Sequence, residues 1–121
     1  MEVSSQAVQI LTEIGMASAA HGLIPPALAI FEGIGAVRPD AEGPALGMAI
    51  TQISSRSYDD AAKTLREQVL TKHPNSIEAK MFLGLALKQA GRNAECDNVL
   101  KELTASGDAR AQAFATALKA P

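Results

Sequence analysis

The residues best suited to chemistry in this chain are two histidines, one cysteine and a pair of adjacent aspartates. His21 and His73 have no second histidine or cysteine at metal-ligand spacing, so the sequence predicts no metal site. Cys96 takes the place of a small residue in a repeated pattern, which favours a packing role over that of a nucleophile. Asp59 and Asp60 suit a helix N-terminus, where acidic side chains meet the positive end of the helix dipole. The chain has no phosphate-binding loop, dinucleotide fingerprint or nucleophile elbow, so we expect neither an enzyme nor a cofactor.

Composition points to helices. Of the 121 residues 47% are hydrophobic, but only 3% are aromatic and tryptophan is absent, so the core must come from Ala, Leu, Ile, Val and Met. Alanine and leucine favour helix, whereas strands are usually richer in aromatic and β-branched residues. The formal net charge is −2 and the basic residues are scattered, which argues against nucleic-acid binding.

Cellular location is also narrowed by simple features. A single cysteine cannot form an intrachain disulfide, which fits a reducing compartment. The start MEVSSQAVQILTEIG lacks the charged first residues and continuous apolar run of a signal peptide. No apolar run is long enough to span a bilayer. We therefore expect a cytoplasmic protein without a membrane span.

The chain repeats one pattern three times, in segments that start at Ile10, Pro44 and Ile77. The positions that coincide are Gly15, Ala49 and Gly84; Gly22, Arg56 and Gly91; Ala27, Ala61 and Cys96; and Phe31, Leu65 and Leu100. The offset is 34 residues between the first two units and 35 between the next two. This is the period of tetratricopeptide helical hairpins, about 34 residues.

Each unit is predicted to form two helices. The predicted helices cover about 5–20, 25–36, 42–54, 58–71, 76–90 and 93–104, with Ser57 and Asn75 as caps. Gly22 and Gly91 suit a turn with positive φ, where Arg56 is unusual. A last helix follows Gly107, with Asp108 as its cap.

The predicted fold class is therefore all-α: three tetratricopeptide-like hairpins in a right-handed α-solenoid, plus a C-terminal capping helix. We expect a single domain over 1–121, with repeats at about 8–40, 42–75 and 77–107 and the last helix at about 108–119. A terminal helix of this kind covers the exposed flank of the last repeat, as repeat arrays require.

The chain resembles the tetratricopeptide superfamily, and the third unit carries the resemblance best. Its LGLAL…AGRNAEC matches the family's Leu-Gly-x-x-Tyr, Gly and Ala positions, with Leu87 in place of Tyr. The resemblance implies that the first helix of each hairpin lines a concave groove. The groove positions, carried over residue by residue, are Thr12, Met16 and Ala19, then Leu46, Ile50 and Ile53, then Met81, Leu85 and Lys88.

The centre of this groove is apolar. Chaperone-adaptor members of the family hold a terminal carboxylate with basic residues, but Thr12, Met16, Leu46 and Ile50 occupy such places here. An apolar groove suits an amphipathic helix, and methionine adapts well to such surfaces. Two other interpretations stay open: the same side chains could cover one another as core, or a second copy of the chain could cover them.

The stretches ALAIFEGIGAVRPDAEGPALGMAI and SYDDAAKTLREQVL are similar to the small tetratricopeptide-like proteins of bacterial type III secretion systems, in particular Hrp-type proteins and needle-subunit chaperones. This resemblance implies a groove that holds the C-terminal amphipathic helix of a needle subunit and prevents premature polymerisation. It also implies a second small helical co-chaperone as a possible partner. The alternatives are a structural protein that forms a homodimer and a generic peptide-binding adaptor.

Overall fold

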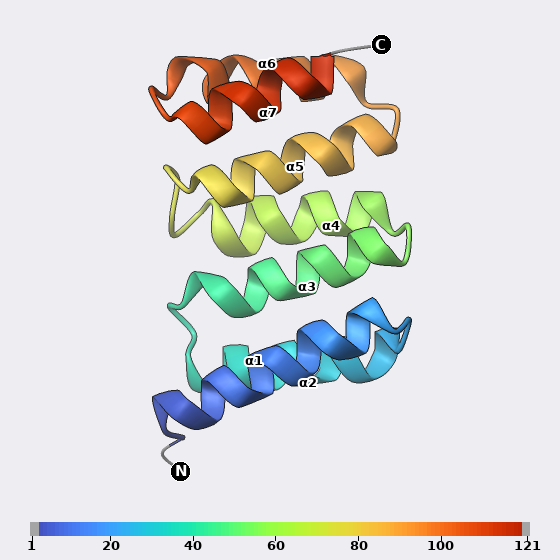
Figure 1. The fold of residues 1–121 in the computed structure, drawn as a ribbon, viewed down its shortest axis with the longest axis vertical. Coiled ribbons are helices and arrows are strands. Elements are labelled where there is room, and N and C mark those ends of the chain that lie inside the picture. Colours follow the sequence, from blue (N-terminus) through green and yellow to red (C-terminus); the bar gives the residue numbers. More distant parts are fainter. Residues whose placement is uncertain (1–2, 120–121) are drawn as a thin grey trace.

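The computed structural model describes residues 3–119, which form seven α-helices, one π-helical turn and no strand (Figure 1). The elements in chain order are α1 (Ser5–Ala20), α2 (Ile24–Val37), α3 (Glu42–Ser54), α4 (Tyr58–Thr64), η1 (Leu65–Val69), α5 (Ile77–Gln89), α6 (Asn93–Ala105) and α7 (Ala109–Lys119). The all-α prediction is confirmed.

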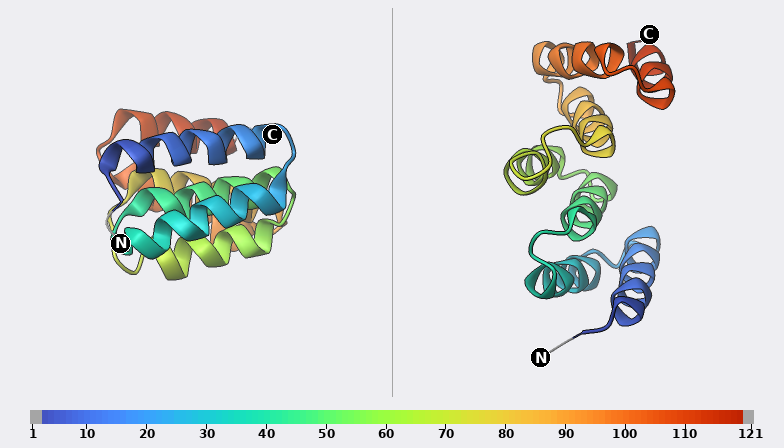
Figure 2. Two further views of the ribbon diagram at one scale, coloured as in Figure 1. Left: turned by 90° about the horizontal axis from the view of Figure 1, so that it is seen from below. Right: turned by 90° about the vertical axis from the view of Figure 1, so that its left-hand side faces the viewer.

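The helices form two layers, which Figure 2 shows nearly end-on. The inner layer holds α1, α3, α5 and α7, and the outer layer holds α2, α4 and α6. Each inner helix contacts the next inner helix, whereas no two of the outer helices contact each other within residues 3–119. The stack is therefore curved, with α1 and α7 projecting at the two ends of the inner side. Such curvature gives helical repeat arrays a concave surface.

The turns within the hairpins follow the predicted glycines. Gly22 and Gly91 adopt φ values of 76° and 77° between the paired helices, and Gly107 adopts 79° before α7. Arg56 occupies the equivalent turn of the middle hairpin with a φ of 63°. A side chain in this left-handed region is sterically strained, because its Cβ lies close to the backbone.

Of the three predicted helix caps, Ser57 does occupy the N-cap position of its helix, Asn75 is wrong and Asp108 is confirmed. The Ser57 side chain makes no capping hydrogen bond, and α5 is capped by Ser76 rather than by Asn75. Asp108 does cap the last helix, because the Ala111 N–H donates to its Oδ1 at 2.9 Å. Asn75 and Ser76 are both residue types that cap helices well. Which of two such neighbours becomes the cap depends on the backbone geometry just outside the helix.

The prediction of one α-helix over 58–71 is wrong in its second half. The α-helical part, α4, ends at Thr64, and η1 continues with hydrogen bonds that span five residues. The Leu70 N–H donates to the Leu65 carbonyl oxygen at 2.8 Å, one residue further back than in an α-helix. A π turn accommodates one extra residue without ending the helix.

The repeat offsets explain where this extra residue lies. The offset from Phe31 to Leu65 is 34, whereas the offset from Pro39 to Pro74 is 35. The middle unit therefore gains one residue between Leu65 and Pro74, and η1 begins at this point.

One aromatic ring packs between the first hairpin and α3. Phe31 is fully buried, and a Cβ added at Gly47 would lie 2.4 Å from its Cε1. A Cβ added at Gly15 would lie 2.8 Å from its Cζ. The ring therefore occupies space left by two glycines on different helices. At Gly84 of the third unit, by contrast, an added Cβ would meet its neighbours no closer than 3.6 Å, an ordinary contact.

Candidate protein-binding face

Three helices of the inner layer carry the nine positions predicted for the groove. We call these positions the inner face: Thr12, Met16 and Ala19 on α1; Leu46, Ile50 and Ile53 on α3; Met81, Leu85 and Lys88 on α5. On each helix they are spaced by three or four residues, which puts them on one side. Because α1 contacts α3 and α3 contacts α5, the three groups lie next to one another.

The apolar members of the inner face are only partly covered. Leu46, Ile50, Ile53, Met81 and Leu85 are half-buried, and Met16 is exposed. Leu46 and Met81 also pack against the main hydrophobic core. These side chains thus contribute to the fold and still keep surface that a partner could cover.

The remaining three members are bound by the chain itself. Ala19 is buried, so it acts by allowing close helix packing. The Thr12 hydroxyl donates to the Val8 carbonyl oxygen at 2.8 Å within its own helix. The Lys88 Nζ donates to the Leu118 carbonyl oxygen near the end of α7. The negative end of the α7 dipole also attracts the positive charge of Lys88 at this place.

The last helix borders the inner face at one end, a role that the prediction of a flank-covering helix did not include. At its start, Arg110 pairs with Glu78 at 3.4 Å, and at its end Leu118 is held by Lys88. Since Glu78 lies in the first turn of α5 and Lys88 in its last turn, α5 and α7 run parallel. Successive inner helices of such an array run parallel, so α7 continues the inner layer.

An apolar side chain that the sequence argument missed lies beside the predicted set. Phe82 is half-buried against the core and lies three residues before Leu85, on the same side of α5. Helical spacing would have identified Phe82, but the groove positions carried over from the family did not include it.

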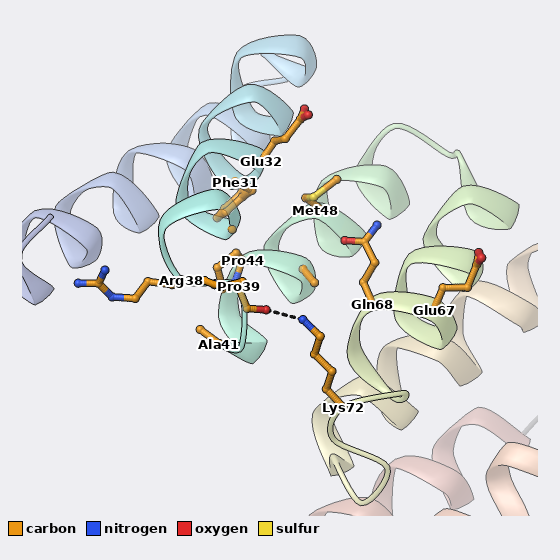
Figure 3. Close-up of a pocket in the computed structure, with 12 residues that line it drawn as sticks. Phe31, Glu32, Arg38, Pro39, Ala41, Pro44, Met48, Glu67, Gln68 and Lys72 are labelled. Atoms are coloured by element: carbon orange, nitrogen blue, oxygen red, sulfur yellow. Dashed lines mark hydrogen bonds between the residues drawn. The ribbon is translucent and has the colours of Figure 1, made fainter. Parts of the chain in front are cut away.

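The outer side carries a cleft of about 590 Å³ between α2, α3 and η1 (Figure 3). It is lined by apolar residues such as Pro44 and Met48 and by the exposed charged residues Glu67 and Lys72. Lys72 is engaged within the chain, because its Nζ donates to the Pro39 carbonyl oxygen at 2.6 Å (Figure 3). This bond ties the loop after η1 to the loop after α2, so this end of the cleft joins two hairpins.

The residues considered for chemistry have structural surroundings. Cys96 is buried, its Sγ donates to the Gly84 carbonyl oxygen at 3.4 Å, and burial raises the pKa of its thiol. His73 Nε2 lies 3.0 Å from the Asp40 carbonyl oxygen. Among residues 3–119 no three His, Cys, Asp or Glu side chains come together as metal ligands would.

Charged groups on the outer helices pair across the hairpins. Arg92 donates from Nε to Asp59 Oδ1 at 2.9 Å, and this partner together with Glu95 raises the pKa of the guanidinium. At the start of α7, the Ala111 N–H lowers the pKa of the Asp108 carboxyl. The ion pairs of Arg92 with Asp59 and Glu95 are exposed, so each contributes little to stability.

None of the helices described is both long enough and apolar enough to cross a bilayer.

Comparison with known proteins supports the fold assignment. No protein-family model matches the chain, and no curated protein matches it in sequence. Among solved structures, the chain is similar to the type III secretion translocator chaperone SycD of Yersinia enterocolitica, in a crystal structure of an alternative dimer. The superposition has a TM-score of 0.78 at 20% sequence identity and covers 98% of this chain and 96% of that chain. At this identity the similarity shows the fold alone: the chain has the tetratricopeptide-like helical fold that this secretion chaperone also adopts.

Proposed function

We propose that this protein is a chaperone that binds an amphipathic helix of another protein on its inner face. The observation that carries the proposal is the set of incompletely buried apolar side chains at the inner-face positions of α1, α3 and α5, of which Met16 is exposed and the other five are half-buried. Helix-in-groove recognition needs an apolar surface of this kind. The similarity to SycD supports the proposal, because that protein is a secretion chaperone of the same fold.

The energy available on the inner face is modest. Met16, the most exposed of the six apolar side chains, is only 36% exposed, so each of them gains at most about 1 kcal/mol on full burial, roughly a third of the 1.5–3 kcal/mol for complete transfer. The six side chains supply at most about 6 kcal/mol before the costs of association and ordering, which are of similar size. The apolar side of the bound helix must therefore contribute a comparable gain, so the partner is a helix that is itself strongly amphipathic.

The partner class that we propose is a component of a type III secretion system. The sequence resemblance implies the C-terminal helix of a needle subunit, and the solved neighbour is described as a chaperone of translocators. In both cases a helix made to pack in an assembly would be covered in the cytoplasm before export. A second small helical co-chaperone is part of the same proposal, and no cofactor or metal is required.

Peptide binding tests the proposal directly. Fluorescently labelled peptides with the sequences of needle-subunit and translocator amphipathic helices are titrated with the protein, and binding is followed by anisotropy. Ile50→Asp and Leu85→Asp should each weaken binding at least tenfold, because each places a carboxylate where the apolar side of the bound helix has to pack. Ala29→Asp is the matched control, since Ala29 is exposed on α2 in the outer layer.

Circular dichroism of the same variants separates binding from folding. Retained helicity with lost binding supports the proposal, whereas unchanged binding in both variants contradicts it. If both variants unfold, these side chains serve as core and the proposal fails. If the inner face instead holds a second copy of the chain, Leu85→Asp converts a dimer into a monomer and no peptide binds.

A further inference from the structure

The cleft on the outer side lies where two outer helices are separated. It is bounded by α2 on one side and by η1 on the other, with α3 between them (Figure 3). Its apolar lining comes from Phe31, Pro44 and Ala45, which are buried, and from Met48, which is half-buried. Its volume of about 590 Å³ is within the range of ligand-binding clefts, about 300–1,000 Å³.

The next gap along the outer layer, between α4 and α6, is bridged by ion pairs. Arg66 of η1 pairs with Glu95 at 3.5 Å, and Arg92 pairs with Asp59 at 2.9 Å. Arg66 lines two smaller clefts in this gap, of about 320 and 410 Å³. The second gap is therefore crossed by side chains of the chain itself.

The repeat shows why the first gap has no such bridge. At the repeat offsets of 34 and 35 residues, Glu32 on α2 is the counterpart of Arg66, and Asp60 on α4 is the counterpart of Glu95. Two carboxylates thus stand at the positions where the second gap has an ion pair, and like charges repel. Neither Glu32 nor Asp60 belongs to an ion pair within residues 3–119.

The charges in the cleft lining that the chain leaves free are negative. Glu32 and Glu67 both line the cleft, are exposed and belong to no ion pair among the described residues. The two cations of the lining are engaged: Arg38 donates to the Val3 carbonyl oxygen, and Lys72 donates to the loop after α2. Glu32 lies six residues before Arg38, or about 9 Å along α2, so the free carboxylate is well separated from this cation (Figure 3).

We propose that this outer cleft binds a basic, partly apolar segment of another protein. A large apolar side chain of the segment packs against Met48, and a lysine or arginine lies between Glu32 and Asp60. A cation in this place supplies what Arg66 supplies in the next gap. Nucleic acids, anionic membranes and acidic segments are disfavoured, because their charge has the same sign as the free carboxylates.

The outer cleft is separate from the inner face. Met48 lies two residues from both Leu46 and Ile50 on α3, so it points to nearly the opposite side of that helix. No residue of α1 or α5 lines the cleft. The chain can therefore hold a helix on its inner face and a second protein in the outer cleft at the same time, as a bridge between them.

Two fluorescent peptides test the sign of the charge that the cleft selects. The sequences are acetyl-GKLGKLGKLG and acetyl-GELGELGELG, which differ only in lysine against glutamate. In anisotropy titrations at low ionic strength, where charge pairs are least screened, the lysine peptide should bind at least tenfold more tightly. Equal binding of the two peptides, or no binding of the lysine peptide, would overturn the proposal.

Charge reversal at Glu32 tests the location. Glu32→Arg should weaken binding of the lysine peptide at least fivefold, because the arginine takes the place of the peptide's cation beside Asp60. Glu13→Arg is the matched control, since Glu13 is exposed on α1 outside the cleft and the net charge changes equally. Equal losses in the two variants would mean unspecific attraction to an acidic chain and would overturn the proposal. If Glu32→Arg loses helicity, Glu32→Gln removes the charge alone and should still weaken binding.

Amide chemical shifts locate the bound peptide independently. The lysine peptide should shift amides within 31–35 and 64–68, on the two sides of the cleft. Shifts confined to α1 and α5 would place the peptide on the inner face and overturn the proposal. Shifts of the cleft amides with protein concentration alone would mean that a second copy fills the cleft, which overturns it as well. Glu32→Arg should still bind helical peptides, so failure of the cleft and failure of the chaperone proposal are distinguishable.

Discussion

A single methyl group added at Gly47 should disrupt the contact between the first hairpin and α3. In Gly47→Ala, the new Cβ would lie between 2.4 and 2.7 Å from three atoms of the Phe31 ring. Carbon atoms in a packed core prefer separations of about 3.5–4.0 Å, so the ring must move by about 1 Å. Phe31 is fully buried and also abuts Gly15, which leaves the ring little room to move.

The size of the effect follows from two opposing terms. Overpacking a core costs roughly 1–3 kcal/mol, and contact with several ring atoms puts this site at the upper end. Replacing glycine by alanine within a helix offsets about 1 kcal/mol of that cost. We expect Gly47→Ala to lower the free energy of unfolding by about 2 kcal/mol, the difference between these two terms.

Gly84→Ala is the matched control, because its added Cβ meets Leu100, Leu118 and Val99 at ordinary distances of 3.6–3.7 Å. Only the helix-propensity term applies there, so this variant should gain about 0.5–1 kcal/mol. Urea unfolding followed by circular dichroism at 222 nm measures both variants. If Gly47→Ala is as stable as the wild type, or if both variants change stability alike, the packing argument is wrong.

Three further predictions concern single residues. Arg56→Gly should raise the free energy of unfolding by about 1 kcal/mol, because glycine tolerates the positive φ at this turn; Arg56→Ala keeps the strain, and equal urea midpoints for the two variants would contradict this explanation. Cys96 keeps its proton in the folded state because burial raises the pKa of its thiol, whereas the thiol ionises near pH 8.5 in the unfolded state. The stability that the neutral thiol contributes is therefore present below about pH 8.5 and is lost as pH rises toward the folded pKa. The urea midpoint of Cys96→Ala should fall less steeply than that of the wild type between about pH 7 and 10. Identical slopes of urea midpoint against pH for the two proteins would refute this linkage. For Asp108 the sign is reversed: its lowered pKa contributes stability above about pH 4 that is lost as pH falls through the folded pKa, so thermal melting of Asp108→Asn should depend less on pH between about 5 and 2. Parallel melting curves for the two proteins would show that the cap does not couple to titration.

Local chemistry made the helical layout predictable. Six of the seven α-helices begin and end within about two residues of the predicted bounds, because glycine turns and apolar spacing act over a few neighbouring residues. The π turn was encoded as one additional residue between Leu65 and Pro74, but no local rule distinguishes a π turn from a longer loop. The π turn keeps both Leu65 and Val69 buried, while Lys72 in the loop after η1 still reaches Pro39 in the loop after α2. This outcome depends on contacts between hairpins.

The candidate site was predictable only in part. Helical spacing and family positions identified Leu46, Ile50 and Leu85, because the side of a helix on which a residue lies is set by its number. Ala19 has the same spacing but is buried, and Lys88 is held by α7. Neither outcome could be deduced from one helix, since both depend on which helix lies next to it.

The sequence by itself determined the period, the helices and the turns, since each depends on residues close together in the chain. Only the tertiary structure decided which surfaces are covered. Gly15 and Gly84 occupy the same position in the repeat, yet a side chain has room at one and not at the other, because different neighbours pack there. Likewise Ile14 on α1 is exposed, whereas its counterpart Met48 is half-buried beside the cleft between α2, α3 and η1, because no described helix precedes α1 as α2 precedes α3.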